Sequence, residues 1–170
     1  MKERDPFELV QRMRAGDVEA GQTFEAEVRA RLERFCRGYL HDADRARDLA
    51  SEAIARLLAS DRTPVPVMPW LLRVARNLCF DSLRAQGERG AVPLDSAFVA
   101  SLTGPLTKLA RIDEQRALER RLERLSETER ELLRLRYVDE LGREEIAGLF
   151  EWTVAQVKSR TFEALRKLRD

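Results

Sequence analysis

Apolar side chains recur every three or four residues through most of the first 86 residues, which is the spacing of one face of an α-helix. Asp5 and Pro6 suit the start of a first helix, Gly16 suits its end, and Asp44 suits the cap of a later helix. Three helical stretches are therefore expected, over residues 6–15, 18–40 and 44–58. Their expected apolar faces contain Leu9, Val10 and Met13; Phe24, Val28, Leu32, Phe35 and Tyr39; and Leu49, Ala53, Ile54 and Leu57.

The segment that follows interrupts this pattern. Residues 61–66 contain Pro64 and Pro66, and proline breaks a helix because it lacks an N–H donor and restricts the residue before it. A fourth helix is expected from Pro69 to Arg84. One face of this helix is apolar, with Leu71, Val74, Ala75 and Leu78. Another face gathers Arg73, Arg76, Asn77, Phe80 and Arg84.

The periodicity disappears after Gln86 and returns near Leu109, and glycines and prolines punctuate the interval. A compact domain rarely contains more than about 20 consecutive residues without regular structure. We therefore expect a first domain over residues 1–86, a linker over 87–110 and a second domain over 111–170.

The second domain is expected to be helical to its end. Leu118, Leu122 and Leu125 precede a capping box, in which Ser126 begins a helix and Glu129 reaches back to it. A short helix from Arg143 to Leu149, a break near residues 150–152 and a final helix from about Thr153 follow. Two short helices joined by a tight turn are typical of a helix-turn-helix.

The final helix has two dissimilar faces. Val154, Val157, Thr161, Leu165 and Leu168 are expected to be buried, while Ala155, Ser159, Phe162 and Arg166 lie roughly opposite, flanked by Lys158 and Glu163. Lys158 and Ser159 suit phosphate or base edges in a major groove, Gln156 suits a base, and Phe162 suits a thymine methyl group. Periodicity alone is equally consistent with a solvated polar face.

The arginine-rich face of the fourth helix favours a different nucleic-acid form. Arginine binds phosphate and stacks on bases, and an aromatic ring such as Phe80 offers a stacking platform for an unpaired strand. A merely solvated arginine face is the alternative.

Composition supports helices, because Leu, Ala, Arg and Glu outnumber the β-branched residues. The net charge of +1 excludes a purely electrostatic DNA binder, so DNA binding must come from local faces and a larger partner. No apolar run of about 20 residues and no signal-peptide core occur, which predicts a cytoplasmic protein without membrane contact.

Cys36, Cys79 and the single His41 fit neither a disulfide framework nor a zinc site. Both cysteines are expected to be buried, and no metal or cofactor is expected; redox sensing is the alternative for the cysteines.

Motifs in both domains resemble the extracytoplasmic-function subfamily of bacterial sigma-70 factors. In the second domain the residues are LRYVDELGREEIA at 135–147 and VKSR at 157–160, which are similar to sigma region 4. In the first domain they are GDVEA at 16–20, RLERF at 31–35, ARDLASE at 46–52, WLLRVARNL at 70–78 and DSLR at 81–84, which are similar to region 2. The resemblance covers nearly the whole chain outside the linker.

This resemblance implies an all-α protein of two small helical domains that directs core RNA polymerase to promoters and assists melting of the −10 element. It implies that duplex −35 DNA binds to Ala155, Gln156, Lys158, Ser159, Arg160, Phe162, Glu163 and Arg166. It implies that the single-stranded −10 element binds to Asp61, Arg62, Arg73, Arg76, Asn77, Phe80 and Arg84. It implies that core polymerase binds to Asp48, Leu49, Ser51, Glu52 and Arg56, and it makes an anti-sigma factor a candidate partner.

Several positions depart from the family pattern. Gly142 replaces a hydroxyl cap, Phe150 and Glu151 replace Leu-Gly at the turn, and Glu163 stands where arginine is frequent. A carboxylate is repelled by phosphate unless it accepts a hydrogen bond from a cytosine amino group. In the first domain Gly21, Ser51, Leu58 and Val67 also differ from the usual residues.

Three other functions are alternatives to that of a sigma factor. A stand-alone helix-turn-helix regulator would bind duplex DNA without polymerase and would leave the arginine face of the fourth helix without a role. A sigma-like adaptor that no longer binds DNA would account for Gly142 and Glu163. An enzyme is not predicted, because no nucleophile–base cluster or phosphate-binding loop is present.

Overall fold

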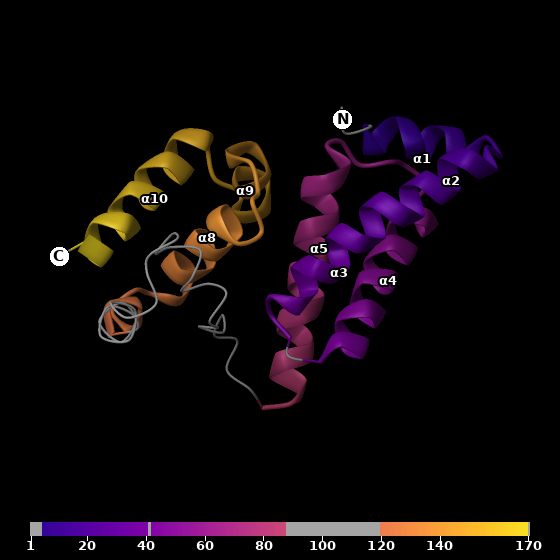
Figure 1. Cartoon of the computed structure of the whole chain (residues 1–170). Coiled ribbons are helices and arrows are strands. Elements are labelled where there is room, and N and C mark those ends of the chain that lie inside the picture. The colour runs from indigo at the N-terminus through magenta and orange to yellow at the C-terminus, as the bar shows by residue number, and fades with distance from the viewer. Residues whose placement is uncertain (1–4, 41, 88–119, 170) are drawn as a thin grey trace, which may run out of the picture. The chain divides into compact units, whose positions relative to one another are not determined.

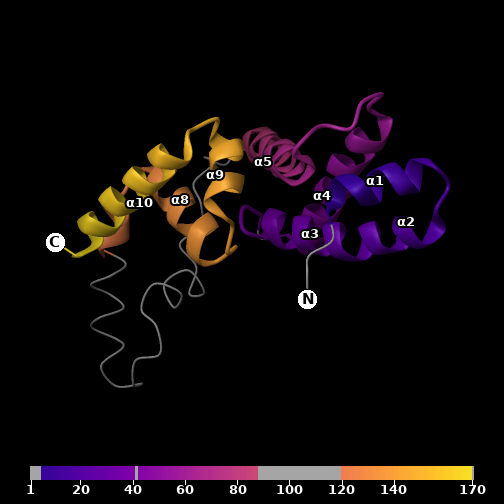
Figure 2. The same ribbon diagram turned by 90° about the horizontal axis from the view of Figure 1, so that it is seen from above.

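A computed structural model describes residues 5–40, 42–87 and 120–169. Every regular element within these residues is a helix, which confirms the expected all-α class (Figures 1 and 2). The chain divides into two compact units, residues 1–90 and residues 91–170. Apart from Gly87, the predicted linker lies outside the described residues, as do His41 and Leu118. None of the described helices is both long enough and apolar enough to cross a membrane.

The described part of the first unit contains six helical elements of varied length. These elements are α1 (Pro6–Arg14), α2 (Val18–Phe24), the π-helical turn η1 (Glu25–Arg29), α3 (Ala30–Arg37), α4 (Ala43–Ala59) and α5 (Val67–Ala85). Because α2, η1 and α3 follow one another directly, the stretch expected over residues 18–40 is one helical run interrupted by a π-turn.

Two helix starts differ from the prediction. Asp42, not Asp44, caps α4: its carboxylate accepts hydrogen bonds from the backbone N–H groups of Asp44 (3.0 Å) and Arg45 (3.1 Å). Helix α5 begins at Val67, two residues before Pro69. Proline is tolerated there because N–H groups in the first turn have no intrahelical acceptor.

The predicted apolar stripe of the second helical stretch lies in the core of the first unit. Its five predicted residues are all at most 3% exposed: Phe24, Val28, Leu32, Phe35 and Tyr39. Helices α3, α4 and α5 pack against one another, and α1 packs against α2 (Figure 1). Leu49 and Val74 are only half-buried, because Ala46 and Ala50 occupy the inner side of α4 and Leu72 that of α5. Cys36 and Cys79 are buried free cysteines, as predicted.

In the second unit, residues 120–123 are helical and are followed by α8 (Glu127–Tyr137), α9 (Arg143–Phe150) and α10 (Val154–Arg169). Its central cluster consists of Leu122, Leu125, Leu133, Ala164 and Leu168, with Val138 and Leu165 packed against it. Helix α10 packs against both α8 and α9. This packing fixes which side of α10 remains exposed.

Capping interactions set the starts of these helices. The predicted capping box is confirmed, because Ser126 Oγ accepts from Glu129 N (3.2 Å) and Glu129 Oε2 accepts from Ser126 N (2.9 Å). Thr153 and Gln156 form the same reciprocal pair at the start of α10, at 3.2 and 2.8 Å. Glu129 also accepts a hydrogen bond from Lys167 Nζ of α10 (2.6 Å). Burial alone would raise the Glu129 pKa, but the hydrogen bonds from Lys167 and Ser126 outweigh it and hold that pKa below its usual value.

The residues of α9 that depart from the family pattern are accommodated by a local hydrogen bond and by the local backbone conformation. Gly142 has no side chain to cap α9, but Glu145 Oε2 accepts from the Gly142 N–H at 3.1 Å, so half of the capping box is kept. Glu151 ends the helix in the left-handed region, at φ 57° and ψ 37°. A side chain in this conformation crowds its own backbone, which is why glycine is preferred there.

We expect Glu151→Gly to stabilise the second unit. Relief of the left-handed conformation contributes about 1–2 kcal/mol, and the added freedom of glycine in the unfolded chain removes about 0.4–1 kcal/mol. The net gain is expected to be about 0.5–1 kcal/mol. Denaturant unfolding followed by Trp152 fluorescence in a Trp70→Phe background measures it. As the control, Glu163→Gly inside α10 is expected to lose about 0.5–1 kcal/mol, and a loss at Glu151 as well would contradict the argument.

Candidate nucleic-acid interface

The outer side of α10 carries the residues predicted to bind duplex DNA. All eight are exposed: Ala155, Gln156, Lys158, Ser159, Arg160, Phe162, Glu163 and Arg166. On the inner side Val157, Ala164 and Leu168 are buried, and Thr161 and Leu165 are half-buried. Val154 was expected to be buried but is 41% exposed, because it stands in the first turn of α10, beyond the edge of the packed surface.

Some of these side chains are held by neighbours. The Gln156 side-chain oxygen accepts the Thr153 N–H in the cap, which orients its amide at the start of α10. Ser159 Oγ lies 3.5 Å from Glu163 Oε1, one turn further along. Glu163 thus stands beside a hydroxyl within the exposed face, and it adds a negative charge to a surface that carries Lys158, Arg160 and Arg166.

Aromatic stacking holds Arg160 at the helix-turn-helix turn. The rings of Phe150 and Trp152 stack with their centroids 4.3 Å apart and their planes 13° apart. The Arg160 guanidinium lies 4.4 Å from the Trp152 centroid. A cation over an indole ring is attracted by the negative face of the π-system. Phe150, one of the two residues that depart from Leu-Gly at this turn, therefore stacks on Trp152, and the Trp152 ring restrains an exposed arginine of α10.

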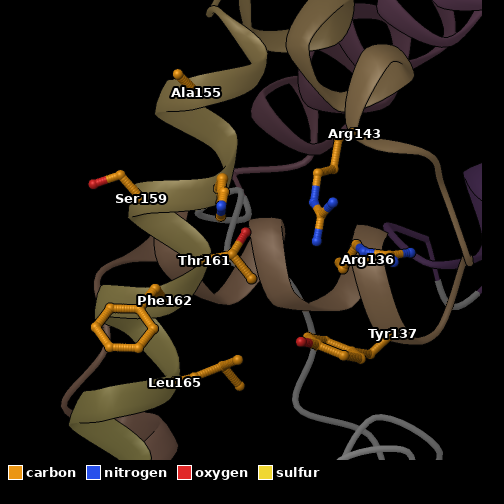
Figure 3. Close-up of a pocket in the computed structure, with 9 residues that line it drawn as sticks. Arg136, Tyr137, Arg143, Ala155, Ser159, Thr161, Phe162 and Leu165 are labelled. Atoms are coloured by element: carbon orange, nitrogen blue, oxygen red, sulfur yellow. The ribbon is translucent and has the colours of Figure 1, made fainter.

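A groove lies between α10 and the corner where α8 is followed by α9 (Figure 3). Its volume is about 520 Å³. Thr161 and Leu165 point from α10 toward Arg136 and Tyr137, while Arg143 approaches from the start of α9 (Figure 3). The remaining lining residues are Ala155, Lys158, Ser159 and Phe162, all four from the predicted DNA-binding set.

Sequence reasoning missed Arg136, Tyr137 and Arg143 as parts of this surface. They lie far from α10 along the chain, and only the folded packing of α8 and α9 brings them beside it. Tyr137 is 37% exposed, although it continues the apolar pattern of α8. Arg136 also donates a hydrogen bond to the Leu141 carbonyl (3.2 Å), which holds the loop before α9.

The arginine-rich face of α5 forms as predicted on one continuous helix. Asn77 and Arg84 are exposed, and Arg73, Arg76 and Phe80 are half-buried. The Arg76 guanidinium lies 4.7 Å from the centroid of the Phe80 ring, and Tyr39 meets that ring edge-to-face at 5.5 Å. Arg84 pairs with Asp81. Phe80 is therefore already covered in part by Arg76, so a base would meet an arginine–aromatic stack instead of a bare ring.

Asp61 and Arg62 lie apart from this face in sequence, within the loop of residues 60–66 that joins α4 to α5. Both side chains are exposed. The Ser60 hydroxyl donates to the Arg62 carbonyl at 2.7 Å, which tightens the start of the loop. Val65, which sequence reasoning did not select, is 74% exposed in the same loop.

The residues predicted to bind a protein partner lie on α4. Asp48, Glu52 and Arg56 are exposed, and Glu52 pairs with Arg56 at 2.7 Å.

Ser51 is half-buried: its hydroxyl accepts from Arg29 Nη1 (2.5 Å) and donates to the Arg47 carbonyl (2.9 Å). Ser51 therefore ties α4 to the π-turn. Leu49 is half-buried, as described above. Leu58, which like Ser51 departs from the family pattern on α4, is 47% exposed and extends the exposed surface of this helix with an apolar group.

Two family models match the chain. The model described as sigma-70 region 2 matches residues 26–89, which include α4, α5 and the loop of residues 60–66 between them. The model described as sigma-70 region 4 matches residues 115–168, which include the helix-turn-helix. The two matches occur in the order that the sequence motifs predicted.

Curated relatives are similar along most of the chain. An RNA polymerase sigma-H factor of Pseudomonas aeruginosa is 28% identical over 92% of this chain and 88% of its own length. The ECF RNA polymerase sigma factor SigW of Bacillus subtilis is 26% identical over 95% of each chain. Among solved structures, the sigma factor RpoE from Bartonella quintana, in complex with the anti-sigma factor NepR, shares the fold at a TM-score of 0.51. It is 19% identical, and the match covers 87% of this chain and 93% of that one.

The stack at the turn gives a stability prediction. Arg160→Ala should lower the free energy of unfolding of the second unit by about 0.5–1 kcal/mol, because it removes the cation from the Trp152 ring. The same Trp70→Phe background allows Trp152 fluorescence to follow the transition. Arg166→Ala, an exposed arginine of the same helix away from that ring, should change stability by less than about 0.5 kcal/mol. Equal effects of the two changes would show that the stack contributes nothing.

Proposed function

The chain belongs to the extracytoplasmic-function group of the sigma-70 family, and we propose that it acts at promoters through three surfaces, on α10, α5 and α4. As a sigma factor, it is a transcription initiation factor that binds core RNA polymerase and promoter DNA. The observation that best supports the residue assignments is that all eight predicted residues on α10 are exposed. The division of labour among the three surfaces is our proposal.

Helix α10 is proposed to bind duplex −35 DNA in the major groove. Lys158, Arg160 and Arg166 supply cations for phosphates, and the stack on Trp152 restrains Arg160 before DNA arrives. Gln156, Ser159 and Phe162 present an amide, a hydroxyl and an apolar ring to base edges. Phosphate contacts set the position of the helix, and base contacts give it sequence preference.

Helix α5 and the loop of residues 60–66 are proposed to hold the unpaired −10 strand. Arg73, Arg76 and Arg84 supply positive charge, and the Arg76–Phe80 stack offers a surface for a base that has left the duplex. Unstacking bases costs a few kcal/mol, and contacts to the opened strand offset that cost. Asp61 and Arg62 are exposed for contact with this strand.

A protein inhibitor is a further proposed partner. The groove beside α10 combines apolar groups, Tyr137, Phe162 and Leu165, with Arg136, Arg143 and Lys158. This combination fits an amphipathic helix with acidic residues along its edges. Because part of the groove belongs to the DNA-binding face, such a helix and −35 DNA would exclude each other. The solved RpoE structure contains an anti-sigma factor, and that class is the one we propose here.

Core polymerase binding tests the proposed function most directly. The double change Asp48→Arg/Glu52→Arg should weaken binding of the full chain to core RNA polymerase by about tenfold or more, because it reverses two exposed charges that face the partner. Fluorescence anisotropy of the labelled chain titrated with core polymerase measures this affinity. Glu8→Arg/Glu19→Arg makes the same charge change on exposed positions of α1 and α2 and should bind like the wild type. Tight duplex binding by the chain alone, with no affinity for core polymerase, would favour a stand-alone regulator instead.

Glu163 gives a second test. Glu163→Gln should tighten binding of the holoenzyme to a duplex promoter fragment by about threefold at low salt, because it removes a negative charge from the DNA-facing side of α10. Titration of labelled fragments at two salt concentrations measures this. Glu127→Gln, an exposed acid of α8, is the charge-matched control. Weaker binding, confined to promoters with one particular base pair, would show that Glu163 reads a cytosine.

A further inference from the structure

The loop of residues 60–66 has few internal contacts to fix its path. Within the loop, the Ser60 hydroxyl donates a hydrogen bond to the Arg62 carbonyl. Among the described residues, no hydrogen bond or ion pair engages the side chains of Asp61 and Arg62, and both are exposed. The position of these two side chains therefore depends on what holds the loop backbone.

Arg14, in the last turn of α1, holds that backbone. Its Nη2 donates to the carbonyls of Ser60 (2.5 Å) and Leu57 (3.3 Å), and its Nη1 donates to the carbonyl of Asp61 (3.2 Å). The last carbonyls of a helix lack intrahelical donors, and a cation is favoured at the negative end of the helix dipole. The planar Arg14 guanidinium thus caps the C-terminus of α4, and it also holds the backbone of the first loop residues.

A second contact comes from the same side of α1. Gln11 stands three residues before Arg14, so the two side chains leave α1 on one face. The Gln11 amide nitrogen donates to Thr63 Oγ1 at 3.0 Å. Together the two residues contact the loop near its beginning and at its middle. Both lie before residue 26, where the match to the region 2 model begins.

We propose that Gln11 and Arg14 are positioning residues that determine how the loop of residues 60–66 meets the −10 strand; this rests on the proposed −10 role of Asp61 and Arg62. Arg14 binds backbone carbonyls, so it sets the course of the loop whatever side chains the loop carries. The side chains of Asp61 and Arg62 then remain available for DNA. Helix α1 thereby acts on −10 selection without touching DNA itself.

The physical effect is preorganisation. A loop that is already ordered loses less conformational freedom when it captures a base. Hydrogen bonds from a charged donor contribute more than neutral ones, so loss of Arg14 should weaken promoter opening by about tenfold. Loss of the Gln11–Thr63 contact should have a smaller effect, of about threefold. Gln11→Ala and Thr63→Val should be non-additive, since each removes the same hydrogen bond.

The experiment uses holoenzyme assembled from the full chain and core RNA polymerase. A promoter is first selected by wild-type holoenzyme from a library randomised in both elements. Opening is then followed by 2-aminopurine fluorescence in the −10 element, and the preference among single-base −10 variants is measured by competition. Arg14→Gln is expected to reduce opening about tenfold and to flatten the −10 preference, with core affinity and −35 preference unchanged. Arg14→Lys is expected to have the thermal stability of the wild type but not its −10 preference. The lysine ammonium group keeps the charge but lacks the planar set of N–H donors that a guanidinium offers.

Arg12→Gln is the matched control, since it removes the same charge from α1. Arg12 pairs with Asp17 (2.7 Å), not with the loop. It should open the promoter with wild-type −10 preference. If Arg14→Gln loses activity but keeps that preference, or if Arg12→Gln has the same effect, Arg14 is merely structural and the proposal is overturned. If wild-type holoenzyme selects no −10 sequence, the proposed function itself fails, and this inference fails with it.

Discussion

The binding surfaces that we propose on α4, α5 and α10 each lie on the side of the helix opposite its buried apolar residues. Short helices are marginal in water by themselves, so packing of one face holds each of them in place. On α10 the buried side is Val157, Ala164 and Leu168, and this orientation exposes the whole opposite side. On α5, burial of Leu71 and Ala75 likewise determines where the arginines lie. A loss of core packing would therefore change the orientation of the proposed binding faces while leaving their residues in place.

Backbone groups at the helix ends form hydrogen bonds with side chains, some from the same helix and some from distant parts of the chain. Ser126 and Thr153 cap their helices with a partner three residues on. Helix α9 lacks a capping side chain and relies on Glu145 alone. Helix α4 relies on Arg14, which is 46 residues away from the carbonyl that it approaches most closely. Local caps stabilise single helices, whereas the long-range cap also joins two helices and a loop into one arrangement.

Much of this architecture could be predicted from the sequence, because helical periodicity and capping boxes are local signals. Phe24 to Tyr39 and Ser126 to Glu129 follow those rules directly. Two errors lie at helix ends, where Asp42 takes the cap instead of Asp44 and Val154 projects beyond the packed surface. Leu49 and Val74 differ for another reason, because neighbouring residues of the same helices occupy the inner side. The groove at Tyr137 and the Arg14 contacts could not be predicted, because they depend on how separate helices pack. The binding roles proposed for the exposed residues rest on the family motifs, since periodicity cannot distinguish a DNA-binding face from a solvated one.

The π-turn at Glu25–Arg29 has a consequence for how the chain compares with its relatives. A π-turn amounts to one additional residue within an α-helix, and it shifts every later position by roughly 100° around the axis relative to an uninterrupted helix. Phe24 before the turn and Leu32 after it nevertheless face the same core. A relative that lacks this residue would keep both faces buried with an uninterrupted helix. A one-residue gap in an alignment at this point would then record a change of helix type, with the fold on either side preserved.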